Sequence, residues 1–171
     1  FRDPVDWGTL IELLNEDYAD LRARRRTSPD SAAHLFFERL DRARTACGGA
    51  AKLAGLDPAT RATLVTALEA EAVDQLKQKQ TEFPEQLEGK TIVLEFARGG
   101  ADGSTMPLAA PFGYQYSISR LSDEILSRAA VLYIWVTPEE SRRKNDARTD
   151  PNDPGSILHH GVPIEVMLKD Y

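Results

Sequence analysis

The sequence is poor in the residues that mark several large classes of protein. It has one cysteine, Cys47, so an intramolecular disulfide is impossible and a reducing cytoplasm is the expected compartment. Its longest apolar run, Ala129–Val136, is far shorter than the ~20 residues of a membrane-spanning helix, and the polar amino end has no signal-peptide pattern. Basic residues are not in excess either. The net charge of −6 over 171 residues argues against nucleic acid as a partner.

Three helices are predicted in the first half of the chain, where no segment has the pattern of a strand. Residues 4–26 carry apolar side chains at helical spacing and end in a run of arginines, which complements the helix dipole. A second helix follows Ser28-Pro29 and ends at Gly48-Gly49, and a third begins at the cap and first-turn pair Asp57-Pro58. We therefore expect one domain, or part of one, in which residues 1–87 form a helical region.

Two apolar segments in the second half have the pattern of strands buried in a parallel sheet. Thr91–Ala97 is the first, and Val131–Val136, a run of β-branched and aromatic residues, is the second. The chain between them contains a helical pattern, as a parallel connection requires. The sequence therefore predicts an α/β fold, rich in helices, in which residues 88–171 contribute a parallel sheet flanked by helices.

A cationic helix is predicted directly after the second strand. Thr137 is a suitable N-cap, Pro138 suits the first helical position, and Glu140 completes a capping box. Its positive side chains are Arg142, Arg143, Lys144 and Arg148. Because Lys144 and Arg148 lie one turn apart on the same face, they could clamp a phosphoryl group in a crevice. The alternative is a surface helix whose charge is balanced by its own acidic residues.

Other candidate site residues lie near the predicted sheet. A carboxylate such as Glu95, near the end of a buried strand, is costly unless it is paired, coordinated or hydrated. It could orient a magnesium-bound water or accept a proton from a substrate hydroxyl, or it could form a structural ion pair with Arg98. Tyr114 could stack on a flat substrate or simply anchor the glycine-rich loop 98–113. The His and Asp residues lack the spacing of a metal site, so none is predicted.

Two stretches, TIVLEFAR at Thr91–Arg98 and AAVLYIWVTPEESRRKNDAR at Ala129–Arg148, resemble the P-loop kinase-like enzymes, and nucleoside kinases most. The resemblance implies that Glu95 is the catalytic base or metal-shell acid and Arg98 its partner. It also implies ATP and Mg²⁺ as cofactors, and a nucleotide and a small molecule as partners. The residues assigned to the lid and to phosphate or substrate binding are Arg148, Lys144 (in place of the family's first lid arginine), Arg142, Arg143 and Tyr114.

The family's phosphate loop is absent from the 171 residues. Gly89-Lys90-Thr91 looks like its end, but the position of the first glycine is Pro84, and the tripeptide enters a strand instead of a helix. We expect residues upstream of Phe1 to supply the loop. The leading hypothesis is an ATP-dependent phosphotransferase acting on a small hydroxyl- or phosphate-bearing substrate. The alternative is a non-catalytic helical interaction or regulatory module with a degenerate kinase-like half, and the oligomeric state is left open.

Overall fold

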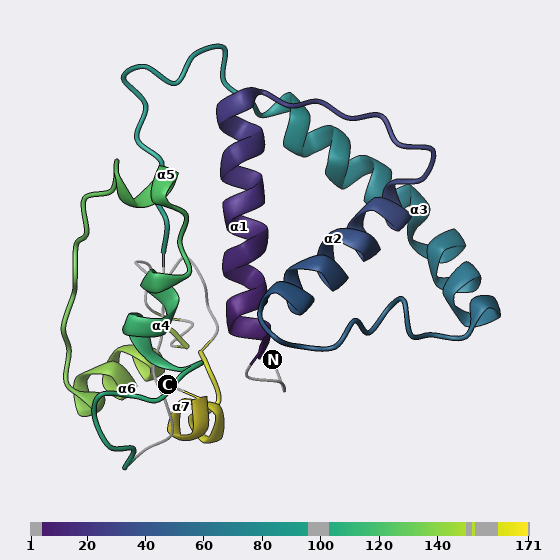
Figure 1. The fold of residues 1–171 in the computed structure, drawn as a ribbon. Helices are drawn as coiled ribbons and strands as arrows, with labels where there is room; N and C mark the ends of the chain where they lie inside the picture. Colours follow the sequence, from purple (N-terminus) through teal and green to yellow (C-terminus); the bar gives the residue numbers. More distant parts are fainter. Residues whose placement is uncertain (1–4, 96–102, 150–151, 153–160, 171) are drawn as a thin grey trace.

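The computed structural model describes residues 5–95, 103–149, 152 and 161–170. Within these ranges the chain forms seven helices and no strand. Three long helices lie together on one side of the molecule, and four short helices, joined by extended chain, lie on the other (Figure 1). The helices are α1 Val5–Ala23, α2 Ala32–Ala46, α3 Pro58–Thr81, α4 Gly113–Ser119, α5 Asp123–Leu126, α6 Pro138–Ala147 and α7 Ile164–Asp170.

The prediction of an α/β fold with a parallel sheet is therefore wrong for the described part of the chain. Thr91–Glu95 and Val131–Val136 lie outside the helices, as predicted strands should. Neither segment, however, has a backbone hydrogen bond to another described segment. An apolar, β-branched run favours extended backbone locally. A strand forms only when a neighbouring strand donates and accepts its hydrogen bonds, and the described residues provide none. Residues 96 and 97 of the first predicted strand lie outside the described ranges.

Two of the helices begin at the capping residues that the sequence predicted. The Asp57 carboxylate accepts hydrogen bonds from the backbone N–H groups of Ala59 and Thr60, at 3.1 and 3.0 Å, at the start of α3. The Thr137 hydroxyl accepts one from the Glu140 N–H, at 3.2 Å, at the start of α6. Because each cap joins residues only two or three positions apart, it can form without any help from the tertiary structure.

The helices are held together by two small apolar clusters. Helix α2 packs on α3 and on α1, and α1 also contacts α4. The cluster between α2 and α3 consists of Ala32, Ala33, Ala72 and Leu76. The cluster between α1 and the second half of the chain consists of Ile11, Leu121 and Ile125, with Leu94 packed against it. The first cluster uses alanines, which let the two helices approach closely, and the second attaches the α4–α5 region to the three long helices.

Asp41, near the end of α2, holds the connection to α3. Its buried carboxylate accepts hydrogen bonds from three successive backbone N–H groups, those of Lys52, Leu53 and Ala54, at 2.8, 3.1 and 2.6 Å. Burial by itself would raise the pKa of Asp41, but these hydrogen bonds outweigh it and lower the pKa below its usual value. A charged Asp41 is therefore part of the folded structure.

Helix α4 meets the three-helix region at Gly8, where there is no space for a side chain. A Cβ atom on Gly8 would lie 2.8 Å from the Cys47 Sγ and closer still to the Tyr116 hydroxyl. Arg120, just after α4, forms an ion pair with Glu12 of α1. Burial raises the pKa of the Cys47 thiol, so the thiol is neutral at physiological pH.

Candidate interaction surface

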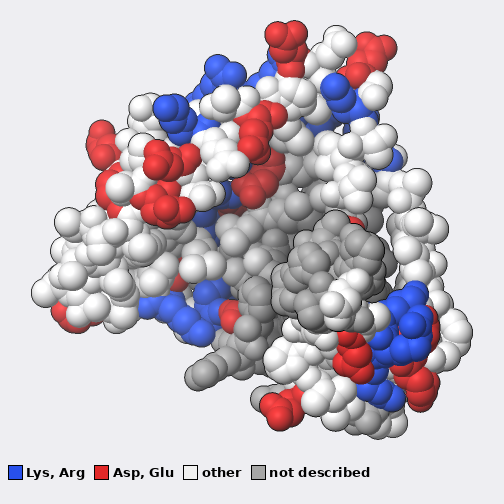
Figure 2. Space-filling view, turned by 180° about the vertical axis from the view of Figure 1, so that it is seen from behind, with Lys and Arg blue, Asp and Glu red and all other residues white. Residues whose placement is uncertain are grey.

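The longest exposed apolar segment in the described part of the chain is Val131–Val136, between α5 and α6. Leu132 is 85% exposed, Ile134 is 73% exposed and Trp135 is 69% exposed. The segment runs as extended chain along the outer edge of the molecule, on the far side of α4 and α5 from α1–α3 (Figure 1). From behind, it is a band of uncharged atoms that leads into the charged surface of α6 (Figure 2).

The backbone of this segment is as exposed as its side chains. Within the described residues, no backbone N–H or C=O group of Val131–Val136 has a hydrogen bond. In extended chain alternate side chains point to opposite faces, so this segment is apolar on both faces. One face carries Val131, Tyr133 and Trp135, and the other carries Leu132, Ile134 and Val136. Unpaired extended backbone is a template for strand pairing, and contiguous exposed apolar surface marks interaction sites.

The segment is fixed near its middle and at its carboxyl end. The Tyr133 ring packs edge-on against the Tyr114 ring of α4, with centroids 5.6 Å apart and planes at 81°. At the carboxyl end, Thr137 caps α6 and Pro138 begins it, so the extended chain stops there. The two roles that the sequence left open for Tyr114, stacking on a substrate and anchoring loop 98–113, stay predictions, because this contact is made to Val131–Val136.

Thr91–Glu95 is a second extended segment, but one of its side chains is anchored. Val93 is 76% exposed, whereas Leu94 packs against the cluster of Ile11 and Leu121. Glu95 is exposed and has no hydrogen bond or ion pair within the described residues. This segment therefore presents less free apolar surface than Val131–Val136, and it ends in a charge.

The cations predicted to bind phosphate lie on α6 and pair with acids of its first turn. Arg143 lies 2.7 Å from Glu140, and Lys144 lies 3.9 Å from the same carboxylate. Arg142 lies 3.7 Å from Glu139. The hydrogen bond from Arg143 is the largest of the effects that lower the pKa of Glu140. This arrangement matches the alternative stated from the sequence, a surface helix that balances its own charge.

Of the predicted catalytic residues, Glu95 and Arg148 lie in the described ranges, and Arg148 belongs to the end of α6. Arg148 is the C-cap of α6 and is exposed, and its backbone N–H donates to the Lys144 carbonyl. No described hydrogen bond or ion pair joins Glu95 to α6. Arg98 lies outside the described residues. The roles assigned to Glu95, Arg98 and Arg148 stay predictions.

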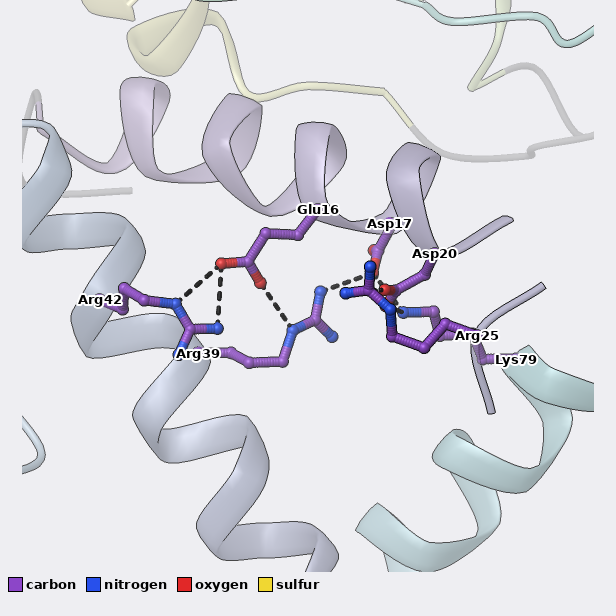
Figure 3. Close-up of polar contacts among 7 residues, drawn as sticks. All are labelled: Glu16, Asp17, Asp20, Arg25, Arg39, Arg42 and Lys79. Atoms are coloured by element: carbon purple, nitrogen blue, oxygen red, sulfur yellow. Dashed lines mark hydrogen bonds and ion pairs between the residues drawn. The ribbon is translucent and has the colours of Figure 1, made fainter. Parts of the chain in front are cut away.

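A network of charged side chains joins α1, α2 and α3 (Figure 3). Glu16 of α1 lies 2.9 Å from Arg39 and 3.0 Å from Arg42, both on α2. Asp17 pairs with Arg39 at 2.5 Å and with Lys79 of α3 at 2.6 Å. The remaining members are Asp20 and Arg25. No local pattern in the sequence indicates the pairs between the helices, because their partners are 22 to 62 positions apart in the chain.

A cleft of about 300 Å³ lies among these charged side chains. Its lining includes Arg39, Arg42 and Lys79, together with Glu16 and Asp20. Each of these cations is paired with a carboxylate of the network, and Arg39 and Arg42 share that of Glu16. We therefore interpret the network as a structural connection among the three long helices.

The described residues contain neither a metal-binding cluster nor a membrane-spanning helix. No group of three or more His, Cys, Asp or Glu side chains there is arranged to hold a metal ion. None of the helices there combines the length and the apolarity needed to cross a membrane. The exposed segment Val131–Val136 is left as the strongest candidate.

Comparisons with protein-family models, with curated proteins and with solved structures give no match to this chain. The resemblance to P-loop kinase-like enzymes is corrected accordingly, because no such enzyme is matched and the described residues contain no sheet. The strand pattern misled because a buried strand and an exposed extended segment can have the same composition. Phosphotransferase activity, with ATP, Mg²⁺ and a small-molecule substrate, stays a prediction without the sheet on which it was based.

Proposed function

We propose that this chain is a non-catalytic protein–protein interaction module. Helices α1–α3 are its folded scaffold, and Val131–Val136 is its binding segment, which pairs as a strand with a strand of another protein chain. In this mode of recognition the backbone hydrogen bonds supply affinity, and side-chain pockets supply specificity.

One observation carries the proposal: Val131–Val136 exposes both its apolar side chains and its backbone hydrogen-bonding groups. Leu132 at 85% and Ile134 at 73% exposed represent a large loss of hydrophobic stabilisation unless something covers them. Covering by another strand satisfies both needs at once, because it buries the side chains and supplies partners for the N–H and C=O groups.

The scaffold favours such binding by reducing its entropic cost. Tyr114 holds Tyr133 near the middle of the segment, and α6 fixes the carboxyl end. A segment that is already extended loses less conformational freedom on pairing than a disordered peptide does, and this increases affinity for the same contacts.

The test is amide hydrogen exchange of the dilute, monomeric protein, with and without a soluble strand peptide. The peptide is an alternation of threonine and valine, with lysines added at both ends. Without peptide, the amides of Val131–Val136 should exchange at nearly the rate of unstructured chain while those of α2 are protected. With peptide, the same amides should become protected. Strong protection in the monomer without peptide would show that the segment is already paired, and would refute the proposal.

A matched pair of variants separates strand pairing from nonspecific hydrophobic association. Ile134→Pro removes a backbone N–H from the middle of the segment and should abolish the protection by peptide. Val93→Pro makes the same change in the other extended segment, at a residue 76% exposed, and should leave the protection unchanged. Equal loss in both variants would contradict the assignment to Val131–Val136.

A further inference from the structure

We infer that the partner of Val131–Val136 is the same segment of a second copy of this chain, paired antiparallel across a two-fold axis. The inference rests on the proposed function and names the partner of the same segment. Two copies would form a two-stranded antiparallel ribbon at the outer edges of the molecules, away from α1–α3.

The composition of the segment suits pairing with itself. It contains no charged residue, no proline and no glycine, which are the residues that usually protect exposed strand edges from one another. When two identical segments pair, every cross-strand contact is between apolar side chains, so no like charges are brought together. Thr91–Glu95 does not have this property, because it ends in a carboxylate and Leu94 is already packed.

The charges at the two ends favour the antiparallel direction. Arg128 precedes the segment, is exposed and has no side-chain partner within the described residues. Glu139, whose side chain is 77% exposed and lies 3.7 Å from Arg142, follows it at the start of α6. Antiparallel pairing brings Arg128 of each copy toward Glu139 of the other, whereas parallel pairing would set Arg128 beside Arg128. This difference in electrostatic energy favours the antiparallel arrangement, which gives a two-fold, self-complementary interface.

Symmetry restricts the register, and the side chains favour one choice. In an antiparallel pair related by a two-fold axis normal to the sheet, one residue lies directly opposite its own copy. With Ile134 at that position, Tyr133 lies opposite Trp135 and Leu132 lies opposite Val136, and each pair occurs twice. Aromatic and aliphatic pairs of this kind each stabilise an antiparallel ribbon. We therefore place the axis at Ile134.

The size of the contact sets the expected strength. The segment has six residues, and its largest side chains, Tyr133 and Trp135, can each bury about 150–250 Å². Two such short strands therefore cover less than the roughly 800 Å² per partner that stable complexes bury. The dimer should therefore be weak, with a dissociation constant on the order of 10–100 μM. Association should consequently be visible only as the protein concentration is raised through this range.

The test follows sedimentation and amide exchange of the full chain over a concentration series that spans this range. We expect mass to double and the amides of Val131–Val136 to become protected together. Ile134→Lys places two like charges opposite each other and should weaken association at least about tenfold. Val93→Lys is the matched control and should not change it. Circular dichroism of both variants checks that the helices are retained.

Cysteine cross-linking in a Cys47→Ser background tests the direction and register. Ile134→Cys should form a disulfide with its own copy. Leu132→Cys should not, but a mixture of Leu132→Cys and Val136→Cys should. Efficient self-linking of Leu132→Cys, Ile134→Cys and Val136→Cys alike would indicate parallel pairing and overturn the inference.

The outcomes for the two proposals are distinguishable. A chain that stays monomeric, with Val131–Val136 unprotected at every concentration, overturns the second-copy inference while leaving an open strand-binding segment. A segment protected in the monomer at the lowest concentration overturns both proposals. Protection that appears only with the dimer supports both.

Discussion

Glu69 of α3 accepts a 2.6 Å hydrogen bond from the hydroxyl of Ser31, the N-cap residue of α2. The same carboxylate also accepts bonds from the backbone N–H groups of Ala32 and Ala33, at 2.8 and 3.2 Å. Those N–H groups have no partner within α2, and the positive end of the helix dipole lies there. One helix thus caps another, 38 positions away in the chain.

Replacement of Glu69 by glutamine should destabilise the three-helix region. The amide keeps an acceptor oxygen but loses the charge at the start of α2, so Tm should fall. The hydrogen bond from Ser31 is the largest of the effects that lower the pKa of Glu69 below its ordinary value. The charged form is therefore the one that stabilises the fold, and its contribution is lost as pH falls through that lowered pKa. Glu71→Gln, on the exposed side of α3, is the control. A parent and a Glu69→Gln variant with the same Tm at neutral pH would contradict the role.

Asp41→Asn should be more costly, because Asp41 is only 8% exposed and holds three backbone N–H groups. We expect a loss of about 2–3 kcal/mol in the free energy of unfolding, since hydrogen bonds to a charged acceptor are replaced by weaker ones. Urea denaturation measures it, and Asp74→Asn on the exposed face of α3 is the control.

The same carboxylate predicts a pH dependence. Because the pKa of Asp41 is lowered in the folded state, its stabilisation is complete above the unfolded pKa of about 4. It is lost as pH falls below that value through the lowered folded pKa. Below this range the parent should become as unstable as Asp41→Asn, and curves that stay separate at the lowest pH would disprove the linkage.

Arg39 and Arg42 allow a comparison of two cations on one carboxylate. Both pair with Glu16, but the Arg39 side chain is 12% exposed and that of Arg42 is 60% exposed. Arg39→Gln should cost about 1.5–3 kcal/mol, because it removes shielded, charged hydrogen bonds to both Glu16 and Asp17. Arg42→Gln should cost less than about 1 kcal/mol, as exposed pairs do. Equal shifts in the urea midpoint would show that burial does not decide the strength of this network.

Gly8→Ala tests the contact between the three-helix region and α4. The added Cβ would lie 2.8 Å from the Cys47 Sγ, so the contact must open, at a cost of about 1–3 kcal/mol. Gly55→Ala is the matched control, because its Cβ meets nothing closer than 3.5 Å. In Gly8→Ala the Cys47 thiol should also react faster with iodoacetamide, since less burial lowers the pKa of the thiol.

The sequence by itself determined where two of the helices begin. Asp57-Pro58 starts α3, and Thr137-Pro138 with Glu140 starts α6, as the pattern predicted. These signals are reliable because the cap and its N–H partner are two or three residues apart, so the bond forms wherever that stretch of chain lies. The charge balance of α6 was also readable, because its ion pairs are three and four residues apart.

Only the tertiary structure decided which acids and cations meet and whether the apolar runs are covered. Glu69 at Ser31 and Asp17 at Lys79 join residues far apart in the chain, and no local pattern encodes those distances. Likewise, the run Val131–Val136 fixes an extended, apolar segment, but a strand needs hydrogen-bonding partners from elsewhere. The described residues provide none, so the segment predicted as buried lies at the surface.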